Sequence, residues 1–420
     1  MFHIFENKDK KYLYLTSYKQ FFEIDENTYL ILKSSKDNDE VNRILSIYEQ
    51  HVNEEDSFVK NDVKELRYGL FLCISNTCNA SCSYCFANKG NYGKDEGIMS
   101  VDIARKAIDF FMNKVPINGQ ANIIFFGGEP LMAYNQLVST CEYIKERYID
   151  SKNIQFHLVT NGTLLNEKII DYIAMNNFSV GISIDGNEKV QNEQRPLKNG
   201  KNSFLEATKH LDYLLKKVKS VHARGTYSNF NNSLVEAYEA LLNLGFKEVN
   251  IAPDILNEDM DKKFNFLIEE LDNLYDYIIN YINNNDDFPF GIFIEHIRRI
   301  FLPRTNIKYT CGLGEVIYSV DIYGDIYPCH RFSSESDYKL GNVMSQGEIK
   351  EFSFTTQECN KCWNQYTCSH GCCYNDYILT DSLNKKNLYW CAYSKKMTEL
   401  CLALIPELSE KHLKRILAVS

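Results

Sequence analysis

Residues 69–86 read GLFLCISNTCNASCSYCF, an apolar strand followed directly by three cysteines with the spacing Cys78-x3-Cys82-x2-Cys85. Thiolates are the standard ligands of iron–sulfur centres, and three of them this close together can wrap one face of a compact cluster. One iron of a [4Fe–4S] cluster would then lack a cysteine, and an open metal position is typical of sites that bind a substrate or cofactor. The alternative at this point is a three-cysteine zinc site.

The same apolar stretch opens an alternation of strands and helices. Runs with strand character lie at 69–75, 122–128, 155–162, 178–186, 220–227 and 248–255. Helical periodicity lies at 101–115, 131–147, 164–175, 204–215, 234–244 and 264–281. Apolar strands that alternate with helices predict a parallel sheet covered by helices. We therefore expect an α/β fold, a partial (β/α)6 TIM-like barrel, with the chemistry at the strand ends. An open doubly wound sheet is the alternative.

The segments on either side of this alternation differ from it. Residues 1–65 contain two strand-like runs, KYLYLT and FFEID, and a helical pattern at 37–50, which together predict a small N-terminal α+β domain. Beyond the barrel, IYSVDI and IYPC around YGD predict a hairpin, and residues 394–417 predict a closing helix. The expected domains are 1–65, a barrel at 66–300, a cysteine-rich domain at 301–393 and a C-terminal helix at 394–420.

Composition narrows the class of protein. The chain has 420 residues, 44% of them apolar, with 8 Pro and 20 Gly, which allows a large core and excludes a collagen-like or low-complexity chain. A net charge of −10 argues against nonspecific binding to nucleic acid or anionic membranes. No apolar run approaches the roughly 18 residues of a membrane span, and MFHIFENKDKK lacks the apolar region of a signal peptide. We expect a cytoplasmic protein, in which 14 cysteines predict metal or redox chemistry rather than disulfides.

The motif CNASCSYC at 78–85 resembles the CxxxCxΦC signature of the radical S-adenosylmethionine (SAM) enzymes. A second motif, Gly127-Gly128-Glu129-Pro130, ends the second strand and is similar to the family's GGEP motif, which faces the amino group of SAM. The resemblance implies that the three cysteines hold a [4Fe–4S] cluster whose free iron binds SAM, with Tyr84 of the motif at the cofactor site. It also implies that SAM is cleaved to a 5′-deoxyadenosyl radical, so that the protein supplies positioning and electrostatics.

Residues at later strand ends match positions where members of this family contact SAM or substrate. They are Asn161, Ser183, Asp185, Arg195 and Arg224. An arginine can pair bidentately with a carboxylate such as that of SAM. Each also has a structural explanation, because Asn-Gly and Asp-Gly are common turns and an isolated arginine is usually a surface residue.

Seven further cysteines resemble the SPASM domain, which binds two auxiliary [4Fe–4S] clusters. Their pattern is Cys311-x12-Gly324-x4-Cys329, then Cys359-x2-Cys362-x5-Cys368-x3-Cys372, then Cys391. The resemblance implies that Cys311, Cys329 and Cys372 hold the first auxiliary cluster. It assigns Cys359, Cys362, Cys368 and Cys391 to the second. A zinc ribbon is the alternative for residues 359–372.

Four cysteines remain outside these patterns. Cys373 is a possible fourth ligand of the first auxiliary cluster, because residues 303–310 contain no cysteine. Neighbouring residues rarely reach the same small cluster, so we expect an open iron there that could bind a substrate thiolate. Cys73, Cys141 and Cys401 lie in apolar contexts and predict buried structural thiols.

The residue after the hairpin cysteine separates two activities of SPASM enzymes. Sulfatase maturases, which oxidise Cys or Ser to formylglycine, usually carry an Asp base there. This chain has His330, in YPCHRF at 327–332, which resembles thioether-forming maturases of ribosomally made peptides, of sactipeptide, ranthipeptide or SCIFF type. His330 is therefore a candidate catalytic residue, or else a residue that orients the cluster.

Function and partners follow from the resemblance. It implies a peptide maturase that installs crosslinks, Cys thioethers above all, in a cysteine-rich precursor peptide. The leader of that peptide would pair with a strand of a winged-helix-like recognition domain at 1–65. A low-potential reductant such as flavodoxin or ferredoxin is also expected, and neither nucleic acid nor membrane. The alternatives are an anaerobic sulfatase-maturing enzyme and, from another class, a multi-cluster electron carrier that would leave GGEP and Arg195 unused.

Overall fold

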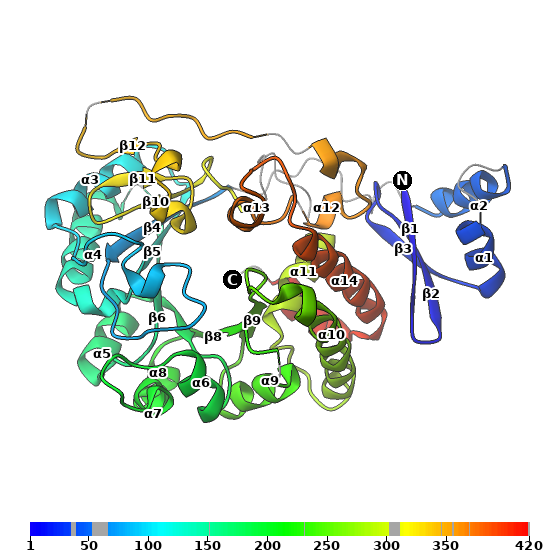
Figure 1. Ribbon diagram of the computed structural model, residues 1–420, viewed down its shortest axis with the longest axis horizontal. Helices are drawn as coiled ribbons and strands as arrows, with labels where there is room; N and C mark the ends of the chain where they lie inside the picture. Colours follow the sequence, from blue (N-terminus) through cyan, green and yellow to red (C-terminus); the bar gives the residue numbers. More distant parts are fainter. Residues whose placement is uncertain are drawn as a thin grey trace. The chain divides into compact units, whose positions relative to one another are not determined.

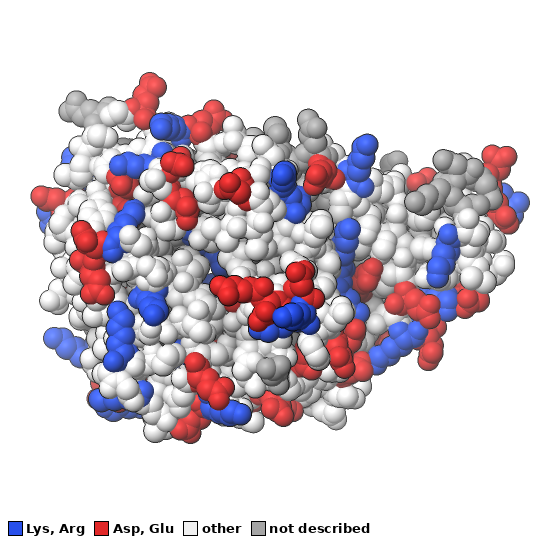
Figure 2. Space-filling model, in the orientation of Figure 1, with Lys and Arg blue, Asp and Glu red and all other residues white. Residues whose placement is uncertain are grey.

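The computed structural model describes residues 1–34, 39–52, 66–150, 152–230, 232–301, 311–345, 347–354, 357–368 and 370–418. Contacts in space between residues divide the chain into two compact units. The barrel unit comprises residues 65–258 and 307–354, and the helical unit comprises residues 1–64, 259–306 and 355–420. Within the described ranges, no helix is long and apolar enough to cross a membrane. Acidic and basic side chains are interspersed on the face shown in Figure 2.

Six parallel strands form the curved sheet of the barrel unit (Figure 1). They are β4 (Arg67–Ser75), β5 (Gln120–Gly127), β6 (Asn153–Thr160), β7 (Ser179–Ser183), β8 (Ser220–Tyr227) and β9 (Val249–Pro253). Each strand pairs with the next one in chain order. Among these six strands the order does not reverse, whereas a doubly wound sheet has a switch point at which it does. The expectation of a partial barrel is thereby confirmed, and the carboxyl ends of the strands share one edge.

Helices connect these strands on the outer side of the sheet (Figure 1). They are α3 (Val101–Met112), α4 (Tyr134–Tyr148), α5 (Glu167–Met175), α6 (Glu188–Gln194), α7 (Ser203–Thr208), α8 (Leu211–Lys217) and α9 (Leu234–Asn243). Ser100, Asn166 and Ser233 cap α3, α5 and α9 by accepting a backbone N–H of the first turn. These side chains fix where the helices begin.

Two predicted helices are divided in the structure. The helical pattern at 204–215 forms α7 and α8, and the hydroxyl of Thr208 donates to the carbonyl of Phe204 at 2.8 Å, a contact that bends helices. The pattern at 131–147 begins with the 3-10 helix Pro130–Ala133 before α4 continues it. Pro130 lies at the first position of that turn, where it loses no hydrogen bond.

The predicted hairpin is present, and it extends the barrel sheet. Strand β10 (Ile317–Val320) pairs antiparallel with β11 (Asp325–Tyr327) and parallel with β4, while β12 (Gly341–Asn342) pairs with β11. Gly69 faces Ile317 in this register, and a Cβ at residue 69 would collide with the Ile317 side chain. The hairpin therefore lies directly beside the first strand of the barrel.

The helical unit begins with an antiparallel sheet of three strands, β1 (Phe2–Asn7), β2 (Lys10–Leu15) and β3 (Gln20–Ile24), with β2 in the centre. Helices α1 (Glu26–Ser34) and α2 (Asp39–Gln50) follow, and Leu13, Ile24 and Val41 belong to their common core. The sequence predicted β2, β3 and α2 but not β1. Residues 37 and 38 of the predicted helix lie outside the described ranges.

Further helices form the rest of the helical unit. They are α10 (Met260–Ile282), α11 (Gly291–Phe301), α12 (Gln365–Cys368), α13 (Cys373–Thr380), α14 (Leu388–Leu404) and α15 (Glu410–Leu417). The single closing helix expected at 394–417 is two helices, since the 3-10 turn Ile405–Glu407 separates α14 from α15. Pro406 lies in that turn and cannot continue a helix.

Candidate iron–sulfur and SAM site

The three cysteines of the first motif lie in the loop that leaves β4, and their thiols are close enough to influence one another. Burial, followed by the charges of Glu129, Cys82 and Cys85, raises the pKa of the Cys78 thiol to about 12. Burial likewise raises the pKa of Cys82. Thiols whose pKa is raised in this way are stabilised as thiolates by a cationic metal group.

This all-thiol donor set fits an iron–sulfur cluster. Among the described residues, no three His, Cys, Asp or Glu side chains are arranged around a single-ion position.

Glycines allow the backbone to pack closely around this loop. A Cβ on Gly128 would lie 2.5 Å from the carbonyl oxygen of Thr77, and a Cβ on Gly90 would lie 2.5 Å from the Cβ of Cys78. Gly127 has a φ of 131°, in the region that favours glycine, and a Cβ there would collide with the Ser75 backbone. The first two residues of the GGEP motif thus fix how β5 approaches the cysteine loop.

Glu129 joins the ends of two strands. One oxygen of its buried carboxylate accepts from the Thr160 hydroxyl at 2.7 Å and from the Leu131 N–H at 3.0 Å. The other accepts from the Asn161 N–H at 2.8 Å. Burial raises the pKa of Glu129. Because protein groups already use both oxygens, the side chain holds the ends of β5 and β6 together.

Asn161 has a similar organising position. Its amide donates to Asn79 at 2.8 Å, and its oxygen accepts from the Thr163 hydroxyl at 2.7 Å. Asn79 in turn donates to the Thr163 hydroxyl at 2.8 Å. Asn79 belongs to the cysteine motif, so this triangle anchors the cysteine loop to the end of β6. The position of Asn79 beside Cys78 was the only sequence signal for that anchor.

Tyr84, Asp185 and Arg195 form a second group, in which Asp185 is buried and the other two residues are half-buried. The Tyr84 hydroxyl donates to Asp185, and Arg195 lies 3.0 Å from the other carboxylate oxygen and 5.3 Å from the Tyr84 ring centre. Burial opposes the charge of Arg195, but Asp185, Tyr84 and Cys82 raise its pKa above the usual range. Its Nε is buried without a hydrogen-bond partner among the described residues. This unpaired donor fits an anionic group such as a carboxylate.

The remaining predicted contacts lie nearby on the same strand edge. Ser183 ends β7 and is paired in register with Arg224 of β8. Arg224 is exposed, whereas Pro130 is buried at the start of its 3-10 turn. The predicted SAM residues therefore lie along the β4 to β8 part of the sheet, except Arg195, which follows the last residue of α6 (Glu188–Gln194).

His330 follows Cys329 at the end of the hairpin and packs against barrel strands. Its ring stacks on Phe71 at 4.1 Å between centroids and lies 4.6 Å from Phe126. Its Nδ1 is 3.6 Å from the Cys329 sulfur. Burial, then Arg331 and Arg224, lowers the pKa of His330 well below its usual value. The sequence did not single out Phe71 or Phe126, although both lie within strands that it predicted.

The later cysteines are divided between the two units. Cys359, Cys362, Cys368 and Cys391 line a single pocket of the helical unit, together with Asp376, Lys386 and Trp390. Burial raises the pKa of Cys391 to about 12 and also raises that of Cys368. Four thiols around one pocket fit a metal cluster as the first motif does. Cys311 and Cys329 belong to the barrel unit, whereas Cys372 belongs to the helical unit.

The cysteines outside both patterns are buried as expected. Cys73, Cys141 and Cys401 are each 0% exposed. Cys373 is also buried, and it begins α13 directly after Cys372, the capping residue. Its charge contributes to the raised pKa of Lys386.

Comparison with known proteins identifies the family. The family model of the radical SAM superfamily matches residues 72–227. The uncharacterized protein MJ0907 of Methanocaldococcus jannaschii is 34% identical over 287 residues, which are 67% of this chain and 90% of that protein. The chain belongs to the radical SAM superfamily. It is a SAM-dependent iron–sulfur enzyme, so the zinc and electron-carrier alternatives are set aside.

Relatives with a stated activity are more distant. A serine-type anaerobic sulfatase-maturating enzyme of Bacteroides thetaiotaomicron is 25% identical over 344 residues, 73% of this chain and 82% of its own. The structure of histidine-tagged anSMEcpe with bound AdoMet covers 84% of this chain and 98% of its own with a TM-score of 0.70 at 22% identity. Streptococcus suis SuiB bound to the precursor peptide SuiA covers 93% and 98%, with a TM-score of 0.53 at 15% identity. These structural likenesses show the fold of this radical SAM enzyme.

Proposed function

We propose that this radical SAM enzyme is a peptide maturase that forms Cys thioether crosslinks in a ribosomally made precursor peptide. The observation that carries the proposal is the surroundings of His330. A neutral imidazole packed on Phe71 stands where a carboxylate base would serve formylglycine formation, and Arg224 and Arg331 act on it electrostatically. A positive potential beside Cys329 favours the approach of a thiolate of the substrate peptide.

The proposed SAM site uses the groups at the ends of β4 to β8. Cys78, Cys82 and Cys85 would hold the [4Fe–4S] cluster, which together with SAM supplies the radical that removes a substrate hydrogen. Arg195 would receive the SAM carboxylate at its unpaired Nε, because Asp185 already fixes the opposite side of the guanidinium. The backbone of Gly128 and Glu129 would face the amino group. The buried Asp185, together with the half-buried Tyr84, would limit the access of water to this end of the site.

The remaining cysteines would hold two auxiliary clusters. Cys359, Cys362, Cys368 and Cys391 are the proposed ligands of one, and they line a common pocket. Cys311 and Cys329 of the barrel unit are proposed ligands of the other, with an iron left open for a substrate thiolate.

The N-terminal segment is the proposed leader-binding element. Its sheet has β1 and β3 as edge strands, and an edge strand can accept an extended peptide as a further strand. Structures with a bound peptide are among those that this fold resembles: SuiB with its precursor peptide covers 93% of this chain, and anSMEcpe with the Cp18Cys peptide covers 81%. Both support a peptide as the substrate class.

The experiment is co-expression with a candidate cysteine-containing precursor peptide, followed by mass spectrometry. Crosslinking removes two hydrogens per bond and makes the cysteine unreactive toward iodoacetamide. The matched control is Cys82→Ala, which removes a proposed cluster ligand and is expected to give unmodified peptide and no 5′-deoxyadenosine. A wild-type enzyme that cleaves SAM but leaves every cysteine of the peptide alkylatable contradicts the proposal.

Formylglycine formation is the second candidate, because several relatives are named anaerobic sulfatase-maturating enzymes. It is tested in the same experiment with a sulfatase-derived Cys or Ser peptide. A hydrazide-reactive aldehyde in that peptide, with no crosslink in the precursor peptide, supports this candidate instead.

A further inference from the structure

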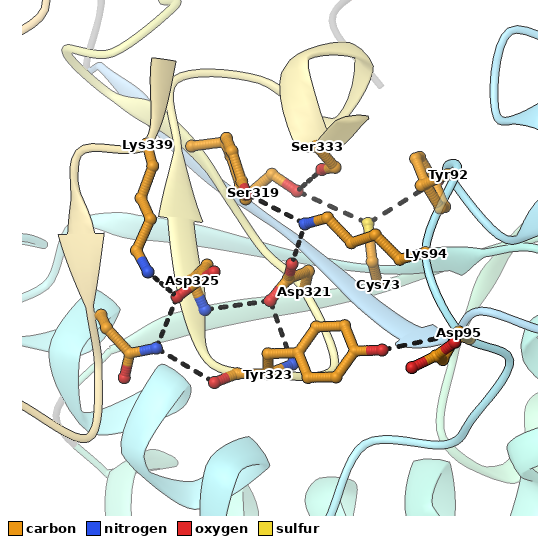
Figure 3. A network of polar contacts seen from close by, with 12 residues as sticks. Cys73, Tyr92, Lys94, Asp95, Ser319, Asp321, Tyr323, Asp325, Ser333 and Lys339 are labelled. Carbon is orange, nitrogen blue, oxygen red and sulfur yellow. Dashed lines mark hydrogen bonds and ion pairs between the residues drawn. The ribbon is translucent and has the colours of Figure 1, made fainter. Parts of the chain in front are cut away.

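The loop at residues 88–95, which follows the three-cysteine motif, is tied to the hairpin that ends at Cys329. Lys94 Nζ donates to Asp321 Oδ2 at 2.7 Å (Figure 3). It also donates to the Tyr327 hydroxyl at 3.0 Å. The Asp321 side chain is 3% exposed and that of Lys94 is 24% exposed. The ammonium also lies 5.0 Å from the centre of the Tyr327 ring, in a cation–π contact.

Asp321 is the residue on which the hairpin turn is built. Its Oδ1 accepts the backbone N–H groups of Tyr323 at 3.0 Å and Asp325 at 2.9 Å, so that Oδ2 is left for Lys94. The Tyr323 hydroxyl donates back to the carbonyl of Asp95 at 3.3 Å (Figure 3). Loss of Lys94 would leave the turn hydrogen bonds in place but a buried carboxylate without its counter-charge.

The 88–95 loop has a backbone that needs such ties. Asn88, Lys89 and Tyr92 have φ values of 46°, 58° and 57°. The left-handed region is unfavourable for side chains such as lysine and tyrosine and persists only where the surroundings fix it. Tyr92 is fixed by burial, since it is 2% exposed and its hydroxyl lies 3.9 Å from the sulfur of Cys73 on β4. That sulfur lies 3.5 Å from the Ser319 hydroxyl on β10.

The same loop reaches the proposed metal ligands. Gly90 packs against Cys78, where a Cβ would come within 2.5 Å of the cysteine Cβ. Burial, then the charges of Cys73, Cys85 and Cys329, raises the pKa of Tyr92, which places its phenol near a cysteine of the first motif and near the hairpin cysteine. One loop therefore contacts both cysteine-bearing segments of the barrel unit.

We propose that Lys94 is a positioning residue: through Asp321 it holds the 88–95 loop, and with it the three-cysteine motif, at a fixed separation from Cys329 and His330. The ion pair thereby sets how much SAM cleavage leads to product rather than to unproductive 5′-deoxyadenosine. The part of this inference that concerns product rests on the proposed peptide-maturase function. The part that concerns the separation of the two segments does not.

The test compares Lys94→Met, Lys94→Arg and Lys339→Met in the reconstituted holoenzyme. Lys339 is the matched control, because it pairs with Asp325 on the outer side of the same hairpin at 2.5 Å and its side chain is 41% exposed. Without peptide, amide exchange of residues 88–95 and 321–327 is expected to become roughly tenfold faster in Lys94→Met, because a buried ion pair has been broken. With peptide, the ratio of 5′-deoxyadenosine to product is expected to rise by about the same factor. Lys94→Arg restores both values, and Lys339→Met changes neither.

Each outcome decides the inference. Unchanged exchange in Lys94→Met overturns it, whatever the substrate proves to be. Faster exchange with an unchanged ratio also overturns it, because Lys94 would then be only stabilising.

If the wild-type enzyme makes no product, the proposed function has failed. The EPR interaction between the reduced clusters, which depends on their separation, then replaces the ratio and must change in Lys94→Met. Should Lys94→Met not fold, the double variant Lys94→Met/Asp321→Asn removes the buried charge, keeps the turn acceptor, and is expected to show the same altered readouts.

Discussion

The thiol of Cys78 has room in its loop because residue 90 is glycine. Gly90 has a φ of 99°, and a Cβ there would lie 2.5 Å from the Cys78 Cβ. Gly93 has a φ of 71°, and a Cβ there would meet no atom within 4 Å. Both glycines relieve backbone strain of about 1–2 kcal/mol, but only Gly90 also gives space to a proposed metal ligand.

We therefore predict that Gly90→Ala loses iron and Gly93→Ala does not. Gly90→Ala moves Cys78, so that the reconstituted protein contains roughly four fewer irons per chain, the content of one [4Fe–4S] cluster. Iron analysis and the visible absorption spectrum measure the effect. Equal iron loss in both variants would show that backbone strain, not the Cys78 contact, decides assembly.

Arg195 gives a second prediction at the scale of one side chain. Arg195→Lys removes the planar fork and its unpaired Nε but keeps a positive charge beside Asp185. We expect SAM to bind about tenfold more weakly, which is the loss of one charge-assisted hydrogen bond. The cluster content should not change. Equilibrium binding of SAM to the reconstituted protein measures this, with Lys198→Ala, a surface residue paired with Glu96, as the control. Unaltered affinity in Arg195→Lys would assign the residue a purely structural role.

At the scale of the elements, β6 and β8 carry two histidines toward each other. His157 of β6 bonds Asn122 of β5 at 3.0 Å. Gly181 of β7 leaves space for side chains of β8, since a Cβ there would lie 2.7 Å from Arg224 Cδ and 2.9 Å from His222 Nε2. Burial and Arg67 lower the pKa of His157 to about 4, and burial, Arg224 and His157 lower that of His222 to about 4. Both rings are therefore neutral in the folded protein at neutral pH.

These strands predict a loss of stability on mild acidification. Unfolded histidines titrate near pH 6.5, so between about pH 6.5 and 4 the unfolded chain binds more protons than the folded one. The free energy of unfolding then falls as the pH is lowered, by at most about 1.4 kcal/mol per pH unit for each histidine. Urea unfolding at pH 7 and 5.5 measures the slope, which the variant His157→Gln/His222→Gln should reduce. An equal slope in the variant would mean that other groups carry the dependence.

At the scale of the whole molecule, the two cysteine sets are carried by different units. Cys78, Cys82 and Cys85 belong to the barrel unit, whereas the four cysteines around the common pocket belong to the helical unit. The effects of mutations at sites that share no interaction partners usually add. SAM cleavage and iron binding at the four-cysteine pocket should therefore be lost in different variants.

The corresponding prediction concerns Cys359→Ala/Cys362→Ala. This variant should lose roughly four irons per chain and still form 5′-deoxyadenosine in the absence of peptide. Cys78→Ala/Cys82→Ala should lose the same amount of iron and form none. Iron analysis and chromatography of the nucleoside distinguish the two. Abolished SAM cleavage in both variants would contradict the separation of the sites.

The sequence alone predicted much of the fold and of the candidate site. Short-range patterns identified the parallel strands, the hairpin and both cysteine arrays, because strand burial and ligand spacing depend on residues close together in the chain. The comparisons confirm the radical SAM family that CNASCSYC and GGEP indicated. Which residues hold each cluster remains a proposal.

Contacts between distant segments were decided only by the tertiary structure. The pairing of β10 with β4, the stacking of His330 on Phe71, and the tie from Lys94 to Asp321 each join residues more than 200 positions apart. Nothing in a local pattern marks such partners, because register and burial are set when the whole sheet closes. The same holds for Glu129, whose GGEP motif was visible but whose bonds to Thr160 and Asn161 depend on two strands meeting at one edge.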